Sequence, residues 1–373
     1  MDVLQLNSKI YFGNDPLNRL RELDFKKIFI VTDPYMVKSG GVEHVINHLP
    51  SGAEYLVYSD VTPDPSINTV TRGAVEMVKF GADCVIALGG GSAIDVSKAM
   101  AFVEKQVSNK PEICYLIAIP TTSGTGSEAT AFAVIKDRKK GIKYPLVNDE
   151  LLPKEAILDV RFVETVPPNV TADTGMDVLT HAIESYVSTV HSLCYEAFAE
   201  KAIRLTCSNL YHAYENPTNK QARTAMHVAS CLAGVAFNHT SLGITHSIAH
   251  QIGTTFKVSH GRSNAIMLPF VIEFNAANSK EAFDRYYQIA VMQGIAASAS
   301  DPAMAVALLI EEIRKLMRKM NMPMSLSECG VSWESFKEHL PTLCENAVND
   351  ACTATNPVPV TVANIEQILL KAF

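Results

Sequence analysis

The sequence predicts an α/β domain built on a doubly wound parallel sheet, followed by an all-helical domain. In the first half of the chain, short β-rich runs alternate with amphipathic helical stretches. After about Val166 the strand-like runs largely disappear, and Ala-, Leu- and Met-rich helical periodicity replaces them. The length of 373 residues, with 47% apolar and 19% charged residues, suits a globular protein with two hydrophobic cores.

Four strands are expected in the first domain. Each run is apolar, β-branched or aromatic and ends in polar or glycine residues, and the four runs cover residues 26–33, 53–60, 82–90 and 114–122. Residues 40–49 and 66–81, which lie between strands, carry apolar positions at three- and four-residue spacing and are expected to be helical. This alternation is typical of βαβ units, whose strands form a parallel sheet.

The domain boundary is expected near residues 165–172, which gives domains of 1–168 and 169–373. The segment VPPNVTADTG, residues 166–175, is predicted to be a loop because of its prolines and asparagine. Near the C-terminus, NPVPV at 356–360 predicts a second loop that precedes a short final helix.

Composition excludes several classes of function. A net charge of −7 argues against nucleic-acid binding, which needs a basic face. No apolar run approaches the roughly 20 residues that span a bilayer, and the first residues do not resemble a secretory signal, so a cytoplasmic location is expected. The eight cysteines include no CxxC pair and are expected to be reduced and mostly buried.

A glycine-rich turn follows the third predicted strand. In ALGGGSAIDVSKAMA, residues 87–101, three glycines and Ser92 stand between a strand and a helix, where backbone N–H groups can bind a pyrophosphate. The turn is not GxGxxG, and taken alone it is about as well explained by a tight turn that requires glycine.

A second loop, IPTTSGTGSEAT at 119–130, follows the next predicted strand and supplies hydroxyl groups, including those of Thr121 and Thr122. Two such loops at neighbouring strand ends are the expected position of a nucleotide crevice, although a surface loop rich in turn residues is the simpler alternative. Asp33, at the end of the first strand, favours NAD over NADP because its carboxylate can accept from ribose hydroxyls and repels an added phosphate. It can equally be a helix cap before Pro34.

Histidines and one aspartate form a candidate metal site in the second domain. Asp177 and His181 are four residues apart in a helical stretch, as are His246 and His250, so each pair shares a helix face. With His260, these segments offer one carboxylate and several imidazoles, which suit a borderline divalent ion. A lone Asp-x3-His pair would more often be an ordinary surface pair, but the histidine cluster reverses that balance.

Several neighbouring residues are interpreted differently. Glu184 is expected to be a surface residue, with orientation of a metal ligand as the alternative. His44 and His48 are also four apart but have no third ligand nearby, so we expect a solvated helix face. Cys231 and Met226 are expected in the core, while His227 and His239 remain undecided.

Six ordered motifs, which span nearly the whole chain, resemble the iron-containing (group III) alcohol dehydrogenase family. They are GGGSAID with Lys98, PTTSGTGSE, TGMDVLTHAIESYV, GITHSIAH, SHGRSNAIMLP and the late TNP. The segments KGIKYPL and TPDP are similar to the branch that contains the 1-propanol dehydrogenase of propanediol-utilization microcompartments.

The resemblance implies roles for particular residues. It implies a metal site for Fe2+, with Zn2+ as an alternative, made of Asp177, His181, His246 and His260. It places His250 beside the nicotinamide and not on the metal. It assigns NAD(H) binding to the remaining matched positions, namely Asp33, Gly89, Gly90, Gly91, Ser92, Asp95, Thr121, Thr122 and Lys143. It also implies a dimer or a larger homo-oligomer, with other microcompartment enzymes or shell proteins as partners.

The expected reaction is reversible hydride transfer between NAD(H) and a short aliphatic alcohol or aldehyde, with the metal as Lewis acid and His250 as proton relay. Propanal, acetaldehyde and butanal all remain open as substrates. Two alternatives also remain open. One is a metal- and NAD-dependent lyase similar to dehydroquinate synthase, which would need a basic pocket. The other is a non-catalytic metal- or nucleotide-binding component of a microcompartment.

Overall fold

A computed structural model describes residues 4, 6, 8–137 and 142–373 of the chain, without the side chains of residues 142 and 143. The chain divides into two compact units, one ending at Val166 and the other covering Pro167–Phe373. The first unit is α/β and the second is helical, so the predicted fold class is confirmed.

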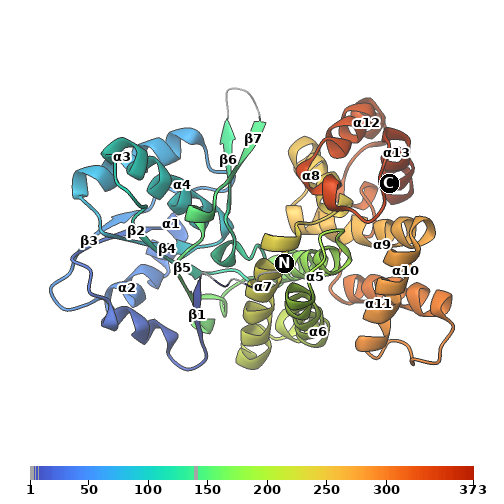
Figure 1. The fold of residues 1–373 in the computed structure, drawn as a ribbon, viewed down its shortest axis with the longest axis horizontal. Coiled ribbons are helices and arrows are strands. Elements are labelled where there is room, and N and C mark those ends of the chain that lie inside the picture. Colours follow the sequence, from blue (N-terminus) through green and yellow to red (C-terminus); the bar gives the residue numbers. More distant parts are fainter. Residues whose placement is uncertain (1–3, 5, 7, 138–141) are drawn as a thin grey trace. The chain divides into compact units, whose positions relative to one another are not determined.

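The first unit contains a six-stranded sheet in the order β1-β8-β5-β4-β2-β3, in which every neighbouring pair is parallel (Figure 1). All four expected strands are present. The six strands are β1 (Lys9–Phe12), β2 (Lys27–Val31), β3 (Glu54–Tyr58), β4 (Cys84–Gly89), β5 (Tyr115–Pro120) and β8 (Glu155–Leu158).

Both faces of this sheet are covered, which is why its central strands are apolar at nearly every position. Phe29 and Val31 of β2 face a core shared with α3 (Ile67–Phe80) and α4 (Gly91–Ser108). Ile28 and Ile30 face the opposite core, shared with α2 (Gly41–Ile46), η1 (Pro16–Glu22) and Met36 of α1 (Pro34–Lys38). Alternate side chains of one strand therefore enter two different cores, the arrangement that a doubly wound sheet requires.

Four strands were not expected from the sequence. β1 and β8 form one end of the sheet, and an antiparallel pair stands apart from it, made of β6 (Phe132–Asp137) and β7 (Ile142–Val147). This part of the chain also contains the short 3-10 helices η2 (Ser127–Ala129), η3 (Asp149–Leu151) and η4 (Val160–Phe162). β1 and β8 have four residues each, too few for a clear alternation of polar and apolar positions.

The second unit contains no strand between residues 167 and 373, all of which the structure describes. Its helices are α5 (Pro168–Val187), α6 (Leu193–Glu215), α7 (Lys220–Thr240), α8 (Ile244–Phe256), α9 (His260–Asn278), α10 (Lys280–Met292), α11 (Pro302–Lys319), α12 (Trp333–Val348) and α13 (Val362–Ala372), with η5 (Ser327–Cys329) and η6 (Ala351–Thr355). The short final helix expected after residues 356–360 is α13, and the prediction is confirmed.

The prediction of a loop over residues 166–175 is wrong for most of that segment. Helix α5 begins at Pro168, directly after Pro167. Proline is well suited to the first turn of a helix, because the N–H group it lacks has no partner there and its φ angle is already helical. The proline pair therefore marks the start of a helix.

Helix α5 is buried on all sides from Gly175 to Val187, which makes it the centre of the helical unit. An added Cβ at Gly175 would lie 2.1 Å from Cδ1 of Leu210 in α6, so the missing side chain permits this close packing. Polar groups on such a helix cannot be solvated and need partners inside the protein. Asp177, His181 and Glu184 are three of these groups.

Among the described residues, no helix combines the length and the apolar character that a membrane crossing requires.

Candidate active site

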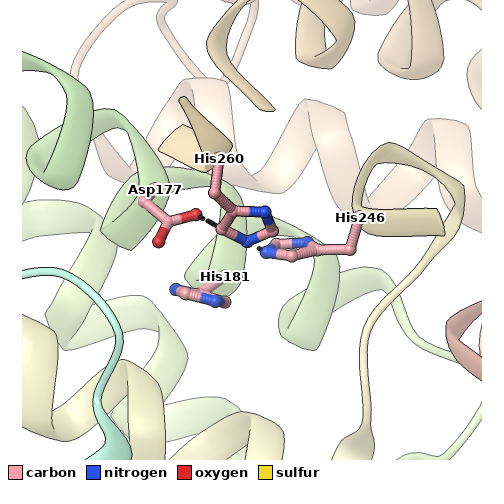
Figure 2. A group of neighbouring side chains, drawn as sticks. All are labelled: Asp177, His181, His246 and His260. Carbon is pink, nitrogen blue, oxygen red and sulfur yellow. Dashed lines mark ion pairs between the residues drawn. The ribbon is translucent and has the colours of Figure 1, made fainter. Parts of the chain in front are cut away.

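The four predicted metal ligands lie together in the helical unit. Asp177 and His181 come from α5, His246 from α8 and His260 from the first residue of α9. Each offers one ligand atom, and these atoms all lie within 4.8 Å of one another. Figure 2 shows the carboxylate and the three imidazoles turned toward one another. Nε2 of His246 and Nε2 of His260 lie 3.7 Å and 3.5 Å from Oδ1 of Asp177.

The orientation of His246 fits a metal ligand. Its Nδ1 lies 2.6 Å from Oε2 of Glu184, while its Nε2 faces the group, is buried and has no hydrogen-bond partner. A buried ring nitrogen without a partner is costly unless something accepts its lone pair or its proton. The donors here, one carboxylate oxygen and three imidazole nitrogens, are those that Fe2+ and Zn2+ bind.

Glu184 is buried, so the expectation of a surface residue is wrong and the alternative role fits. Its carboxylate accepts from the backbone N–H groups of Gly243 and Thr245 at 3.0 Å and 2.7 Å, in addition to its contact with His246. The residue lies seven positions after Asp177, in the part of α5 that is buried on all sides. Since this part has no exposed face, its sequence has no alternation of polar and apolar faces that could show Glu184 to be buried. A carboxylate on the far nitrogen of a ligand histidine fixes the ring and its tautomer.

Replacing Glu184 with glutamine should weaken metal binding by about 10- to 100-fold, because the ring of His246 loses its anionic partner while the side-chain volume is kept. The measurement is a chelator competition on anaerobic protein. Glu200→Gln, on the neighbouring helix α6, is the control, and equal affinities in the two variants would contradict this role for Glu184.

Electrostatics in the group favour an anionic carboxylate. Burial alone would raise the pKa of Asp177, but the imidazoles of His181, His260 and His246 hold that pKa well below its ordinary value. Burial, together with the neighbouring imidazoles, lowers the pKa of His260 to about 3 despite the attraction of Asp177. For His246 burial also favours the neutral form, but the nearby carboxylates of Asp177 and Glu184 outweigh it and raise the pKa to about 9.

Two residues of α9 that sequence reasoning did not select help to build the group. The buried Asn264 donates from Nδ2 to Oδ1 of Asp177 at 2.7 Å, and the same nitrogen lies 3.2 Å from Nε2 of His260. A Cβ added at Gly261 would lie 2.0 Å from the carbonyl oxygen of Asp173, so α9 approaches the backbone of α5 closely at this point. Both lie within the SHGRSN motif, whose spacing of one helical turn between His260 and Asn264 was the available signal.

His250 lies beside this group but outside it. Its ring stacks on that of His260, with centroids 5.4 Å apart and an angle of 12° between the planes. Its Nδ1 lies 2.8 Å from Oδ2 of Asp350, and the side chain is 41% exposed. His250 therefore lies outside the four grouped side chains, and its position beside the nicotinamide stays a prediction.

In the first unit, the two predicted loops lie against each other at the carboxyl ends of β4 and β5. β4 ends at Gly89, and α4 starts at Gly91 with Gly90 as its N-cap. A Cβ at Gly90 would lie 3.3 Å from Oγ1 of Thr122, and one at Gly91 would lie 2.8 Å from Cγ2 of Thr125. Glycine is therefore needed at Gly91 for the second loop to approach the start of the helix. Backbone N–H groups at such a start bind phosphate groups well.

Lys98 of α4 holds the second loop in place. Its ammonium group is fully buried and donates to the carbonyl oxygens of Ser127, Thr130 and Phe132 at 2.7, 2.8 and 2.7 Å. The same group contacts the hydroxyls of Ser127 and Thr130. Burial lowers the pKa of Lys98 to about 8, although the negative charges of Asp95 and Glu128 oppose that shift.

This shift predicts a pH dependence of stability. The unfolded chain, with an ordinary lysine pKa near 10.5, binds more protons than the folded chain between pH 8 and 10.5. The contribution of Lys98 to the free energy of unfolding should therefore rise with pH across that window, by ~3 kcal/mol at most. Urea unfolding of the wild type and of Lys98→Met at pH 7.5, 8.5 and 9.5 measures it. If the difference between the two proteins stays constant over this range, the assignment of the shift to Lys98 is wrong.

Two further predicted coenzyme residues, Asp33 and Asp95, lie beside the glycine turn and the second loop. Asp33 caps α1, because its Oδ1 accepts from the N–H groups of Tyr35 and Met36, as the alternative interpretation had it. Its Oδ2 faces the glycine turn, 3.5 Å from where a Cβ of Gly89 would stand. Both carboxylate oxygens of Asp95 accept hydrogen bonds, from the Ser127 hydroxyl and from the backbone of Val134. The side chain of Lys143 lies outside the described residues.

The fold and the grouped side chains are those expected of an iron-containing alcohol dehydrogenase. Residues 7–160 match the family model for iron-containing alcohol dehydrogenase, and residues 171–373 match the model for the C-terminal part of the Fe-containing alcohol dehydrogenase family. The chain belongs to this family and is an oxidoreductase.

Two relatives show the branch of the family. The chain is 39% identical to a 1-propanol dehydrogenase PduQ of Citrobacter freundii, over 99% of both chains. It is 41% identical to an NADPH-dependent butanol dehydrogenase of Clostridium saccharobutylicum, over 93% of this chain and 92% of that protein.

Solved structures agree with the fold. A 1,3-propanediol oxidoreductase superposes with a TM-score of 0.92 at 30% identity, covering 98% of each chain. A sulfoacetaldehyde reductase of Bifidobacterium kashiwanohense, solved in complex with NAD+, gives 0.89 at 27% identity, covering all of this chain and 98% of that one.

Proposed function

We propose that this chain is an NAD-dependent, iron-dependent alcohol dehydrogenase that interconverts short primary alcohols and aldehydes, with propan-1-ol and propanal as the leading pair. The observation that carries the proposal is the convergence of one carboxylate and three imidazoles on one point of the helical unit. The 1-propanol and butanol dehydrogenases among the relatives support a substrate of about this size.

In this proposal Asp177, His181, His246 and His260 hold Fe2+, and Zn2+ suits the same donors. The ion, when bound, supplies Lewis acidity that polarises the substrate oxygen. Glu184 keeps Nε2 of His246 turned toward the group by binding its Nδ1. Asn264 keeps the carboxylate of Asp177 in place.

His250 is the proposed proton relay. Its Nδ1 faces Asp350, which leaves Nε2 to exchange a proton between the alcohol and solvent, and its partial exposure gives the ring access to water. If His250→Ala retains both its metal and its turnover, the histidine is not on the proton path.

NAD(H) is proposed to bind at the sheet edge of the first unit. The N-terminus of α4 would take the pyrophosphate, while Thr121 and Thr122 offer hydroxyls beside it. Gly89, Gly90 and Gly91, with Ser92 next to them, provide the close approach, and Lys143 remains a predicted contact.

Coenzyme preference tests the role of Asp33. One relative is named NADPH-dependent, although a carboxylate near the ribose should repel the added phosphate of NADPH. The coenzyme preference of this chain therefore needs a direct measurement. The wild type should prefer NADH, and Asp33→Ser should shift the ratio of kcat/KM values toward NADPH by at least about tenfold, a difference of ~1.4 kcal/mol. Serine removes the charge but can still cap α1. Asp60→Ser, at the end of the neighbouring strand β3, is the control. A wild type that prefers NADPH would refute this role.

The activity itself is tested with anaerobic, iron-loaded protein. Oxidation of NADH should be followed with acetaldehyde, propanal and butanal, and formation of NADH with propan-1-ol, with kcat/KM highest for one of the short chains. A lyase that recycles its coenzyme would give no net change in NADH. Protein that binds NADH and iron but reduces no aldehyde would favour the non-catalytic alternative.

Assembly and location are further parts of the proposal, supported by the resemblance to the 1-propanol dehydrogenase branch. We expect a homodimer or a larger homo-oligomer in the cytoplasm, packaged with the enzymes and shell proteins of a microcompartment. Analytical ultracentrifugation tests the first part. Co-sedimentation with intact shells tests the second.

A further inference from the structure

A second group of metal-binding side chains lies outside the four-residue group. His250 of α8, Asp350 at the N-cap of η6, and Cys352 of η6 place their ligand atoms within 4.8 Å of one another. All three side chains are half-buried. They come from two segments that lie a hundred residues apart in the sequence, so only the fold brings them together.

The carboxylate at the centre of this second group is held firmly. Oδ1 of Asp350 accepts from the backbone N–H of Cys352 at 3.0 Å and lies 3.4 Å from the hydroxyl of Ser247. Oδ2 lies 2.8 Å from Nδ1 of His250. The hydroxyl of Thr353 donates to that of Ser247 at 2.8 Å, which ties η6 to α8. The three donors are therefore positioned by the fold before any ligand arrives.

The donor set differs in kind from that of the first group. It contains sulfur, whereas the first group offers only nitrogen and oxygen. A thiolate, an imidazole and a carboxylate are typical ligands of Zn2+, with water in a fourth position. A thiolate and a carboxylate together carry two negative charges, which balance those of one divalent ion. Burial and the charge of Asp350 raise the pKa of the Cys352 thiol well above its ordinary value, so the thiol keeps its proton until a cation displaces it.

We propose that His250, Asp350 and Cys352 form a second cation site, which binds a thiophilic divalent ion such as Zn2+ and inhibits the enzyme. On binding, the S–H bond of Cys352 breaks, a bond from sulfur to the ion forms, and the proton leaves to solvent. The proton that Nδ1 of His250 shares with Asp350 moves through solvent to Nε2, and Nδ1 binds the ion instead. Nε2 then carries a proton already and cannot accept one from the substrate. The inhibition rests on the proposed function of His250, whereas the binding does not.

Cobalt is the probe for binding, because Co2+ replaces Zn2+ and gives a near-ultraviolet charge-transfer band when bound to a thiolate. Anaerobic, iron-loaded full-length protein is titrated with Co2+, and its iron content is measured before and after. The wild type should develop the band with its iron retained, since nitrogen and oxygen donors at the first group give no such band. Cys329→Ala, which removes a half-buried thiol elsewhere in the helical unit, should behave like the wild type.

Cys352→Ala and Cys352→Ser should each lose the band, and the serine variant covers the case in which alanine disturbs the fold. Asp350→Asn, which keeps the thiol, should need more Co2+ to reach the same band. A band of full intensity in both Cys352 variants, or no band in the wild type, would overturn the proposal.

Zinc inhibition is then compared as the ratio of rates with and without Zn2+ in each variant. We expect strong inhibition of the wild type and of Cys329→Ala, whereas Cys352→Ser should need at least tenfold more Zn2+ for the same inhibition, equal to ~1.4 kcal/mol in binding. Equal inhibition of all variants would refute the inhibitory role. If no variant reduces aldehydes at all, the proposed function fails, while the cobalt band still decides whether the second site exists.

Discussion

Replacing His246 or His260 with alanine should give protein that purifies without iron and has lost aldehyde reduction by about a thousandfold or more. Each substitution removes one of four donors, and His246 also carries the buried Nε2 that faces the group. Loss of a Lewis acid costs several kcal/mol of transition-state stabilisation, and each ~1.4 kcal/mol is a factor of ten. Metal analysis of anaerobic protein and the rate of NADH oxidation are the two measurements.

His250→Ala is the matched control for both variants, because His250 shares a helix with His246 and stacks on His260 without joining the group. It should keep its iron and lose only part of its activity. Stoichiometric iron in His246→Ala, or an empty site in His250→Ala, would reverse the assignment of ligand and neighbour.

Gly261→Ala should destabilise the helical unit and empty the candidate metal site together. The added Cβ would lie 2.0 Å from the carbonyl oxygen of Asp173, and backbone cannot move aside as the end of a side chain can. The first turn of α9, which carries His260, must then shift away from Asp177. Overpacking of this kind typically costs ~1–3 kcal/mol, and we expect the upper end of that range in urea unfolding.

Gly253→Ala serves as the comparison for this substitution. Its Cβ would lie 3.3 Å from the carbonyl oxygen of Val258, a contact that a shift of a few tenths of an ångström relieves. It should therefore retain iron. If Gly261→Ala binds iron as tightly as the wild type, the close approach of α9 and α5 is not needed for the site.

The fold was predictable where pattern and length are strong. β2, β4 and β5 could be recognised because each is an almost unbroken apolar run buried between two cores, and the edge strand β3 could be recognised by its aromatic and β-branched residues. β1 and β8 could not, since four residues carry too little pattern. The start of α5 was missed because two prolines were interpreted as a loop, although one proline is favourable in a first helical turn.

The candidate metal ligands could be predicted from the sequence better than the residues that hold those ligands in position. The spacing of four residues in Asp177 and His181 gives a shared helix face directly. Glu184 lies on the same helix, but only three-dimensional packing shows that it is buried against α8. The second group has no local spacing at all, because Asp350 and Cys352 meet His250 only through tertiary structure.

The double engagement of Glu184 has an evolutionary consequence. One carboxylate both receives the first N–H groups of α8 and holds the ring of His246, so a single codon is under selection for folding and for catalysis at once. We expect this position to tolerate little substitution, because loss of the side chain removes both contacts at once. A homologue that no longer binds the metal would still be expected to keep a glutamate there, because the carboxylate accepts N–H groups at the start of α8.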